Sequence, residues 1–287
     1  EMEYDWPTVL TETIYLVSDQ MLSQYIMSDE RSFIELREMQ LNKRKGVVAE
    51  DVYNRSVEYG KALSAKIVDW IEQDNFDATR YFSFYKAPSR VGNPQLWVPT
   101  ESYQEACEPY WPELRTFALP AVNHCHVLLD VEFSTDTGSI FYKATKEVLE
   151  IDMNMTDGQR AIALHWADDP GETATPPGHW TYIMNYISLH EEMPLDKAAE
   201  MYALVGIGIA DAFISAWDSK YRVNLVRPET YIQEFMGYPE WESLVETPPF
   251  PEYPSGHSVV SAAAATLLTD LLGENHAFTD STHLLIG

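Results

Sequence analysis

The sequence predicts an all-α protein built as a multi-helix bundle. Apolar residues recur with helical periodicity along most of the chain, whereas the strict alternation typical of β-strands is scarce. Long connections rich in proline and aromatic residues join the expected helices, chiefly residues 85–120 and 168–177. Loops of this length and composition are usually functional or packed as lids.

Each expected helix follows apolar residues spaced three or four positions apart. The last one begins at Ser255, a suitable N-cap, and is closed by Gly273. We interpret residues 1–287 as one all-α domain that is incomplete at its C-terminus, with an N-terminal helical part over 1–150 and the functional motifs in 151–287. The expected helices cover residues 7–25, 51–74, 138–150, 157–166, 178–190, 195–223 and 255–272.

The composition excludes several partners. A formal net charge of −26 argues against nucleic acids and anionic membranes, which are polyanions. No stretch approaches the roughly 20 uninterrupted apolar residues that span a bilayer. The chain starts at Glu1 and shows no signal-peptide core, so we expect a removed export signal and a secreted or periplasmic protein. Cys107 and Cys125 can form one disulfide or stay as two thiols. The sequence is also compatible with a homo-oligomer.

Two motifs indicate oxyanion chemistry. Lys220 and Arg227-Pro228 form a Lys-x6-Arg-Pro motif, and Pro254-Ser255-Gly256-His257 follows about 30 residues later. On one helix, positions seven apart lie about 20° apart around the axis, so we expect Lys220 and Arg227 to point the same way. The second motif opens an apolar helix whose free N–H groups favour an anion, and Gly256 lets the backbone approach it. Small oxyanions such as phosphate or vanadate are therefore the expected ligands.

With these residues the chain resembles the vanadium-dependent haloperoxidases, within the superfamily that also contains the type 2 phosphatidic acid phosphatases; it looks like the soluble bacterial type. The resemblance implies a helical bundle that binds vanadate through Lys220, Arg227, Ser255 and Gly256. His257 would contact the apical oxygen and exchange a proton with hydrogen peroxide, while Lys220 polarises the peroxide. Halide would then be oxidised to hypohalous acid. Trp217 and Phe250 stand where the family has aromatic residues beside the halide.

The third motif of the family, an arginine followed by the axial histidine, has no match. After Arg227 the chain contains no lysine or arginine. The resemblance therefore predicts that a C-terminal continuation or a second polypeptide supplies both residues. Two other functions stay open. Phosphate can occupy the same site, as in an acid phosphatase that works through a phosphohistidine, or the chain can be a non-catalytic oxyanion-binding subunit.

Two further segments contain candidate residues. Pro176-Pro177-Gly178-His179-Trp180 imitates the second motif without its hydroxyl, which favours an aromatic helix start over a second anion site. The segment His165-Trp166-Ala167-Asp168-Asp169 either places an acid near the pocket or, the favoured interpretation, caps the loop after a helix.

Overall fold

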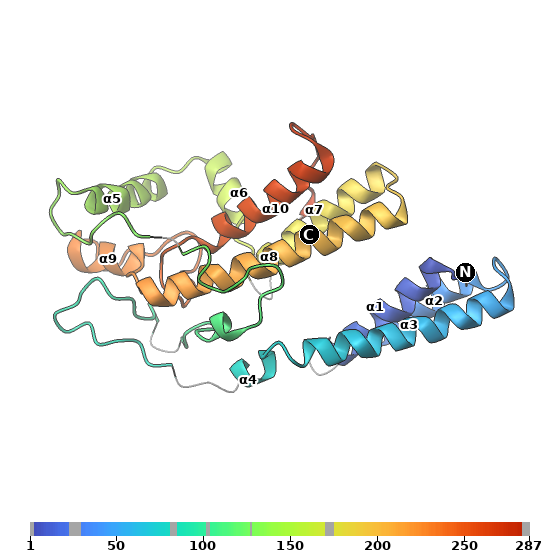
Figure 1. Ribbon diagram of the computed structural model, residues 1–287. Coiled ribbons are helices and arrows are strands. Elements are labelled where there is room, and N and C mark those ends of the chain that lie inside the picture. The colour runs from blue at the N-terminus through green and yellow to red at the C-terminus, as the bar shows by residue number, and fades with distance from the viewer. Residues whose placement is uncertain are drawn as a thin grey trace. The chain divides into compact units, whose positions relative to one another are not determined.

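The computed structural model describes residues 3–22, 30–80, 85–101, 104–126, 128–169 and 175–282 (Figure 1). Within these ranges the chain is helical, and its β-pairing is limited to one isolated bridge between Leu96 and Leu225. The prediction of an all-α bundle is confirmed. The chain packs as two compact units, residues 1–77 and 78–287, which are described separately. The expected single domain divided near residue 150 stays a prediction.

The first unit consists of three helices, α1 (Trp6–Leu22), α2 (Glu30–Arg44) and α3 (Glu50–Ile71). Helix α3 approaches α1 closely at Gly60, where a Cβ atom would lie 2.7 Å from Cβ of Glu12. Helix α2 was not expected because its apolar residues, such as Phe33, Leu36 and Met39, are mixed with charged ones and do not gather on one face. It is held by ion pairs instead: Arg37 binds the buried Glu12 at 2.7 Å, and Arg44 binds the buried Asp5 at 2.5 Å.

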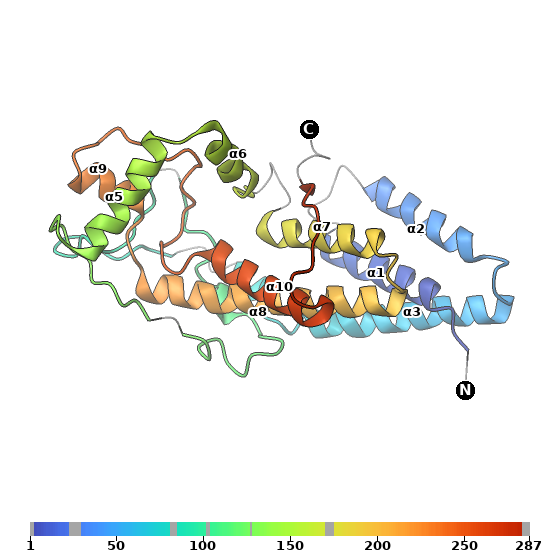
Figure 2. The same cartoon turned by 90° about the horizontal axis from the view of Figure 1, so that it is seen from above.

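The second unit is centred on α8 (Leu195–Val223), with α7 (Thr175–His190) and α10 (Gly256–Leu272) packed along it (Figures 1 and 2). Helices α8 and α10 approach closely at Gly208, where a Cβ atom would lie 2.3 Å from Leu267. These three helices bury the core of this unit: Trp180, Ile183, Met184, Ile187, Met201, Val205, Ile209, Val260, Ala264 and Leu268.

Among its described residues the second unit also contains four shorter elements: the 3-10 turn η1 (Trp111–Glu113), α5 (Ile140–Met153), α6 (Asp157–His165) and α9 (Pro228–Phe235). Helix α4 (Phe76–Arg80) spans the boundary between the two units in the sequence. Helix α5 packs against α9, where Phe141 meets Tyr231 with ring centroids 5.2 Å apart. The loop before α5 is fixed to α8, because the buried carboxylate of Asp211 accepts hydrogen bonds from the backbone N–H groups of residues 117, 118 and 119. This contact secures a long irregular segment beside the functional end of α8.

Helix α8 is the one described helix that is long and apolar enough to cross a membrane. That criterion considers length and composition only, and a helix in the core of a bundle also meets it. Cys107, which is half-buried, and Cys125, which is exposed, are not joined by a disulfide. The disulfide considered from the sequence is therefore absent from this structure.

Candidate functional site

Lys220 lies in the last turn of α8 and is almost completely buried, with 1% of its surface exposed. Its ammonium group donates hydrogen bonds to the backbone carbonyls of Pro251 at 2.9 Å and Glu252 at 3.0 Å. Burial, and then the neighbouring charge of Arg227, lower the pKa of Lys220 to about 7. A nearby anion would oppose this shift, so the lysine is prepared to bind one.

Arg227 does not continue the helix that carries Lys220, so the argument from two helical turns is wrong. Helix α8 ends because Asn224 adopts a left-handed conformation with φ of 52°. The chain then pairs with the preceding loop, Val226 N–H donating to the carbonyl of Gln95 at 2.8 Å, and Arg227 becomes the N-cap of α9. The turn nevertheless brings the two cations together. Their charged groups lie 4.6 Å (Lys220) and 5.2 Å (Arg227) from the centre of the Phe250 ring.

Arg227 has unused capacity for hydrogen bonds. Its Nη1 lies 3.2 Å from a carboxylate oxygen of Glu252, but its buried Nε has no hydrogen-bond partner among the described residues. Burial lowers the pKa of Arg227, with Glu252 and Glu229 opposing that effect. An unpaired buried N–H donor beside a buried lysine fits an anion with several acceptor oxygens.

The second motif lies at the N-terminus of α10, against the first. Ser255 is the N-cap, and its hydroxyl accepts a hydrogen bond from Ser258 N–H at 3.2 Å. A Cβ atom at Gly256 would lie 3.4 Å from the ring of Trp217 and 3.9 Å from Cε of Lys220. The first-turn N–H groups of α10 lack helical acceptors. The close approach at Gly256 therefore joins two motifs whose nearest residues, Pro228 and Pro254, are 26 positions apart in the sequence.

Trp217 and Phe250 form an aromatic wall beside the cations, with ring centroids 5.2 Å apart. The indole N–H of Trp217 donates to the carbonyl of Cys107 at 3.2 Å, and the Tyr221 hydroxyl donates to the same carbonyl at 2.6 Å. These bonds fix the position of the tryptophan ring. The structure thus brings Trp217, Lys220, Arg227, Phe250 and Gly256 together, and Ser255 and His257 flank Gly256 in the chain.

His257 is half exposed, with 47% of its side chain accessible, and its Nε2 lies 3.8 Å from a carboxylate oxygen of Asp168. Asp168 is buried, follows α6, and accepts a hydrogen bond from His179 Nδ1 at 2.9 Å. The favoured interpretation, that this acid only caps a loop, is therefore wrong for Asp168. His179 was expected only as part of an aromatic helix start. It does lie in the first turns of α7, but as a fully buried polar residue.

The comparisons agree with this geometry. A family model described as the second helical-bundle domain of VCPO matches residues 200–285, the segment that contains both motifs. The vanadium chloroperoxidase of Curvularia inaequalis is 30% identical over an alignment of 129 residues, and the match covers 37% of this chain and 21% of that protein.

Two solved structures resemble the whole fold. The first bacterial vanadium-dependent iodoperoxidase superposes with a TM-score of 0.83 at 32% identity, over 94% of this chain and 66% of its own. The holo-type bacterial vanadium-dependent chloroperoxidase has a TM-score of 0.69 at 17% identity, over 92% and 66%, and so supports the fold alone. The chain therefore spans about two thirds of its structural relatives and about a fifth of the curated one.

The fold and the site define an all-helical protein in which two buried cations, Lys220 and Arg227, lie beside an aromatic wall and a helix N-terminus. With the comparisons, they show that the chain belongs to the vanadium-dependent haloperoxidase family.

Proposed function

We propose that this chain carries the vanadate-binding part of a haloperoxidase that oxidises halide with hydrogen peroxide to hypohalous acid. The observation that carries the proposal is the buried pair Lys220 and Arg227 on the Phe250 ring, with Gly256 packed against the lysine. The residues fit vanadate, because they offer two buried cationic side chains and an unpaired buried N–H, and the carboxylate that contacts Arg227, Glu252, is partly exposed. Bound vanadate would act as a Lewis acid toward peroxide.

The residues of the chain have separable tasks. Arg227 presents a planar fork for two oxygens, whereas Lys220 acts as a point charge whose proton affinity depends on what it faces. The first-turn N–H groups of α10 and the Ser255 hydroxyl complete the anion contacts. His257 is half exposed and stands beside Asp168, so it can accept a proton from an incoming peroxide and return it later.

The aromatic wall favours halide oxidation over phosphate-ester hydrolysis. Trp217 and Phe250 give the cations an apolar, polarisable boundary, where a weakly hydrated halide can approach. A phosphomonoester would need polar contacts for its leaving group. Hydrolysis of a chromogenic phosphate ester without any halide oxidation would support the phosphatase instead.

We also propose that an arginine and a histidine from outside residues 1–287 complete the site. The segment after Arg227 supplies no further cation, and a buried polyanion needs balanced charge and hydrogen bonds. Intact-mass analysis of the native protein, with identification of copurifying chains, would test this. A native protein of residues 1–287 alone with full haloperoxidase activity would refute it.

Vanadate binding by Arg227→Ala tests the proposal, with Arg222→Ala as the matched control. Arg222 lies in the last turn of α8 with 38% of its side chain exposed, so its loss removes the same charge outside the site. Losing charged hydrogen bonds should weaken binding about 10- to 100-fold in Arg227→Ala and little in Arg222→Ala. Equal affinity of both variants and the wild-type chain, measured by calorimetry, would refute the assignment of this site.

A further inference from the structure

A chain of alternating imidazoles and carboxylates leads from His257 into the core of the second unit. His179 lies between two carboxylates: its Nδ1 is 2.9 Å and 3.1 Å from the two oxygens of Asp168, and its Nε2 is 2.7 Å from Asp280. The same Asp280 oxygen lies 2.8 Å from Nε2 of His165. Asp168 therefore links this cluster to His257.

The geometry determines the charge of His179. A neutral imidazole has one N–H and one lone pair, so one of its nitrogens would direct a lone pair at a carboxylate oxygen. Both ring nitrogens face carboxylates at hydrogen-bond distance, and both bonds form only if the ring carries two protons. The side chain of His179 is fully buried, and Trp166 stacks on it with centroids 4.3 Å apart and planes at 9°. With both carboxylates ionised, this geometry makes His179 a buried imidazolium.

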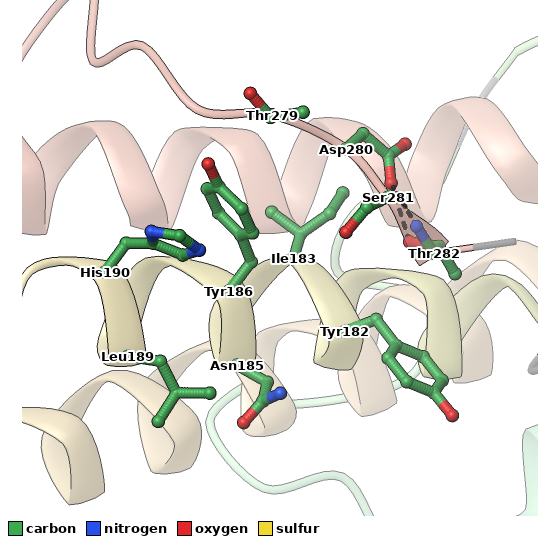
Figure 3. Close-up of a pocket in the computed structure, with 10 residues that line it drawn as sticks. All are labelled: Tyr182, Ile183, Asn185, Tyr186, Leu189, His190, Thr279, Asp280, Ser281 and Thr282. Carbon is green, nitrogen blue, oxygen red and sulfur yellow. Dashed lines mark hydrogen bonds between the residues drawn. The ribbon is translucent and has the colours of Figure 1, made fainter. Parts of the chain in front are cut away.

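Asp280 accepts the hydrogen bond from the second protonated nitrogen of His179, Nε2. Burial alone would raise the pKa of its carboxyl group, but hydrogen bonds from Thr282, His165 and His179 together hold that pKa below its ordinary value. Figure 3 shows Asp280 bonded to Thr282 beside α7, at the edge of a groove of about 230 Å³ that Tyr182, Tyr186 and His190 also line. The far end of the cluster thus lies next to an open groove, 19% of the Asp280 side chain being exposed.

We propose that His179 and Asp280 are positioning residues that set the proton affinity of His257 through Asp168. The inference rests on the proposed function, because it concerns the histidine that would exchange protons with peroxide. While His179 is charged, it neutralises part of the field that Asp168 exerts on His257. If Asp280 loses its charge, His179 loses its second proton, and the full charge of Asp168 then acts on His257.

A metal site is the competing interpretation of the same cluster. Ligand atoms of His165, His179 and Asp280 lie within 4.8 Å of one another. However, both imidazole Nε2 atoms are directed at a single Asp280 oxygen, which lies where a shared cation would have to sit. The arrangement is therefore complete as a hydrogen-bonded cluster.

The test is a histidine NMR titration of the chain without vanadate, in the wild type, Asp280→Asn and His179→Gln. The resonance of His257 is assigned with His257→Ala. In both variants the positive charge of His179 next to Asp168 is lost. The negative charge of Asp168 then acts more strongly on His257 and should raise its titration midpoint by about one pH unit. The other charged groups around the site, Lys220, Arg227 and Glu252, are unchanged. Asp280→Glu should bring the midpoint back toward the wild-type value.

The matched control is Glu191→Gln. It removes a carboxylate from another histidine pair, Glu191 with His276 at 2.8 Å, outside this cluster, and should leave His257 unchanged. A midpoint for His257 that stays at the wild-type value in both folded variants would overturn the proposal. So would wild-type nitrogen shifts showing a neutral His179 at neutral pH, or stoichiometric zinc bound at the cluster. Because the readout needs neither vanadate nor turnover, it is independent of the Arg227 binding test.

Discussion

Replacing Lys220 with methionine should stabilise the protein at acidic and neutral pH while removing its anion site. The folded pKa is about 7, against 10.5 for an ordinary lysine, a depression of about 3.5 units. Since one unit corresponds to about 1.4 kcal/mol, the buried charge lowers the free energy of unfolding by roughly 5 kcal/mol below pH 7. The lost hydrogen bonds to Pro251 and Glu252 offset about 2 kcal/mol of the gain.

The pH dependence is the distinctive part of this prediction. Between pH 7 and 10.5 the unfolded state of the wild-type chain binds more protons than the folded state, so wild-type stability rises with pH in that window. Lys220→Met lacks this proton, and its advantage of about 3 kcal/mol near pH 6 should fall by up to about 1.4 kcal/mol per unit and reverse near pH 9. Removing the buried charge of Lys220 thus stabilises the folded state but also removes a cation that binds the anion.

Urea unfolding followed by tryptophan fluorescence, repeated from about pH 6 to 10 without oxyanions, measures this difference. Lys197→Met is the matched control, because Lys197 is on the same helix with 61% of its side chain exposed and pairs only with Glu200 at 2.9 Å in the described contacts. Its difference from wild type should be flat below about pH 9. A pH-independent difference for Lys220→Met, or one that grows with pH, would refute the reasoning.

Two further substitutions separate the contacts of the site. Gly256→Ala should fold with stability within about 1 kcal/mol of wild type, but bind oxyanion about tenfold more weakly, because its Cβ atom, 3.4 Å from the Trp217 ring, would fill space beside Lys220 where the anion approaches the backbone. Gly158→Ala, with nothing within 4 Å, should change neither. His257→Ala should abolish peroxide-dependent halide oxidation by the complete protein and leave vanadate binding measurable by calorimetry. Binding lost as fully as in Arg227→Ala would instead make His257 a primary anion contact.

The sequence predicted the helices that depend on apolar periodicity and missed those that depend on charge. Helix α8 occupies the expected residues 195–223, and α10 begins one residue after the expected start. Helix α2 escaped prediction because Arg37 and Arg44 hold it through two buried acids, Glu12 in α1 and Asp5 just before it, contacts that no local pattern reveals. Helix α9 is only eight residues long, and its N-terminal Pro228 was considered only as part of a motif.

The site was predicted at the level of its motifs and only partly at the level of its geometry. Lys220 and Arg227 were expected to be neighbours, but a left-handed turn at Asn224 rather than a continuous helix brings them together. The partners of His257 were harder to find. Asp280 lies 101 residues after His179 and approaches it only when the segment after α10 packs on α7. The one feature of the local sequence that drew attention to His179 was its position directly after Pro-Pro-Gly at an expected helix start.

The balance of buried charges distinguishes the functional cations from the structural ones. In the first unit each buried acid meets its own arginine, Glu12 with Arg37 and Asp5 with Arg44, as a pair that contributes to the fold should. In the second unit the two buried cations have one ion-pair partner among the described residues, the partly exposed Glu252, with Glu229 acting on Arg227 from further away, and the Nε of Arg227 has no hydrogen-bond partner in the described part of the chain. Such an excess of positive charge destabilises a folded protein. The chain has a net charge of −26, so carboxylates are abundant elsewhere, and yet Lys220 and Arg227 are not fully neutralised. This local excess of positive charge indicates a site that binds an anion from solution.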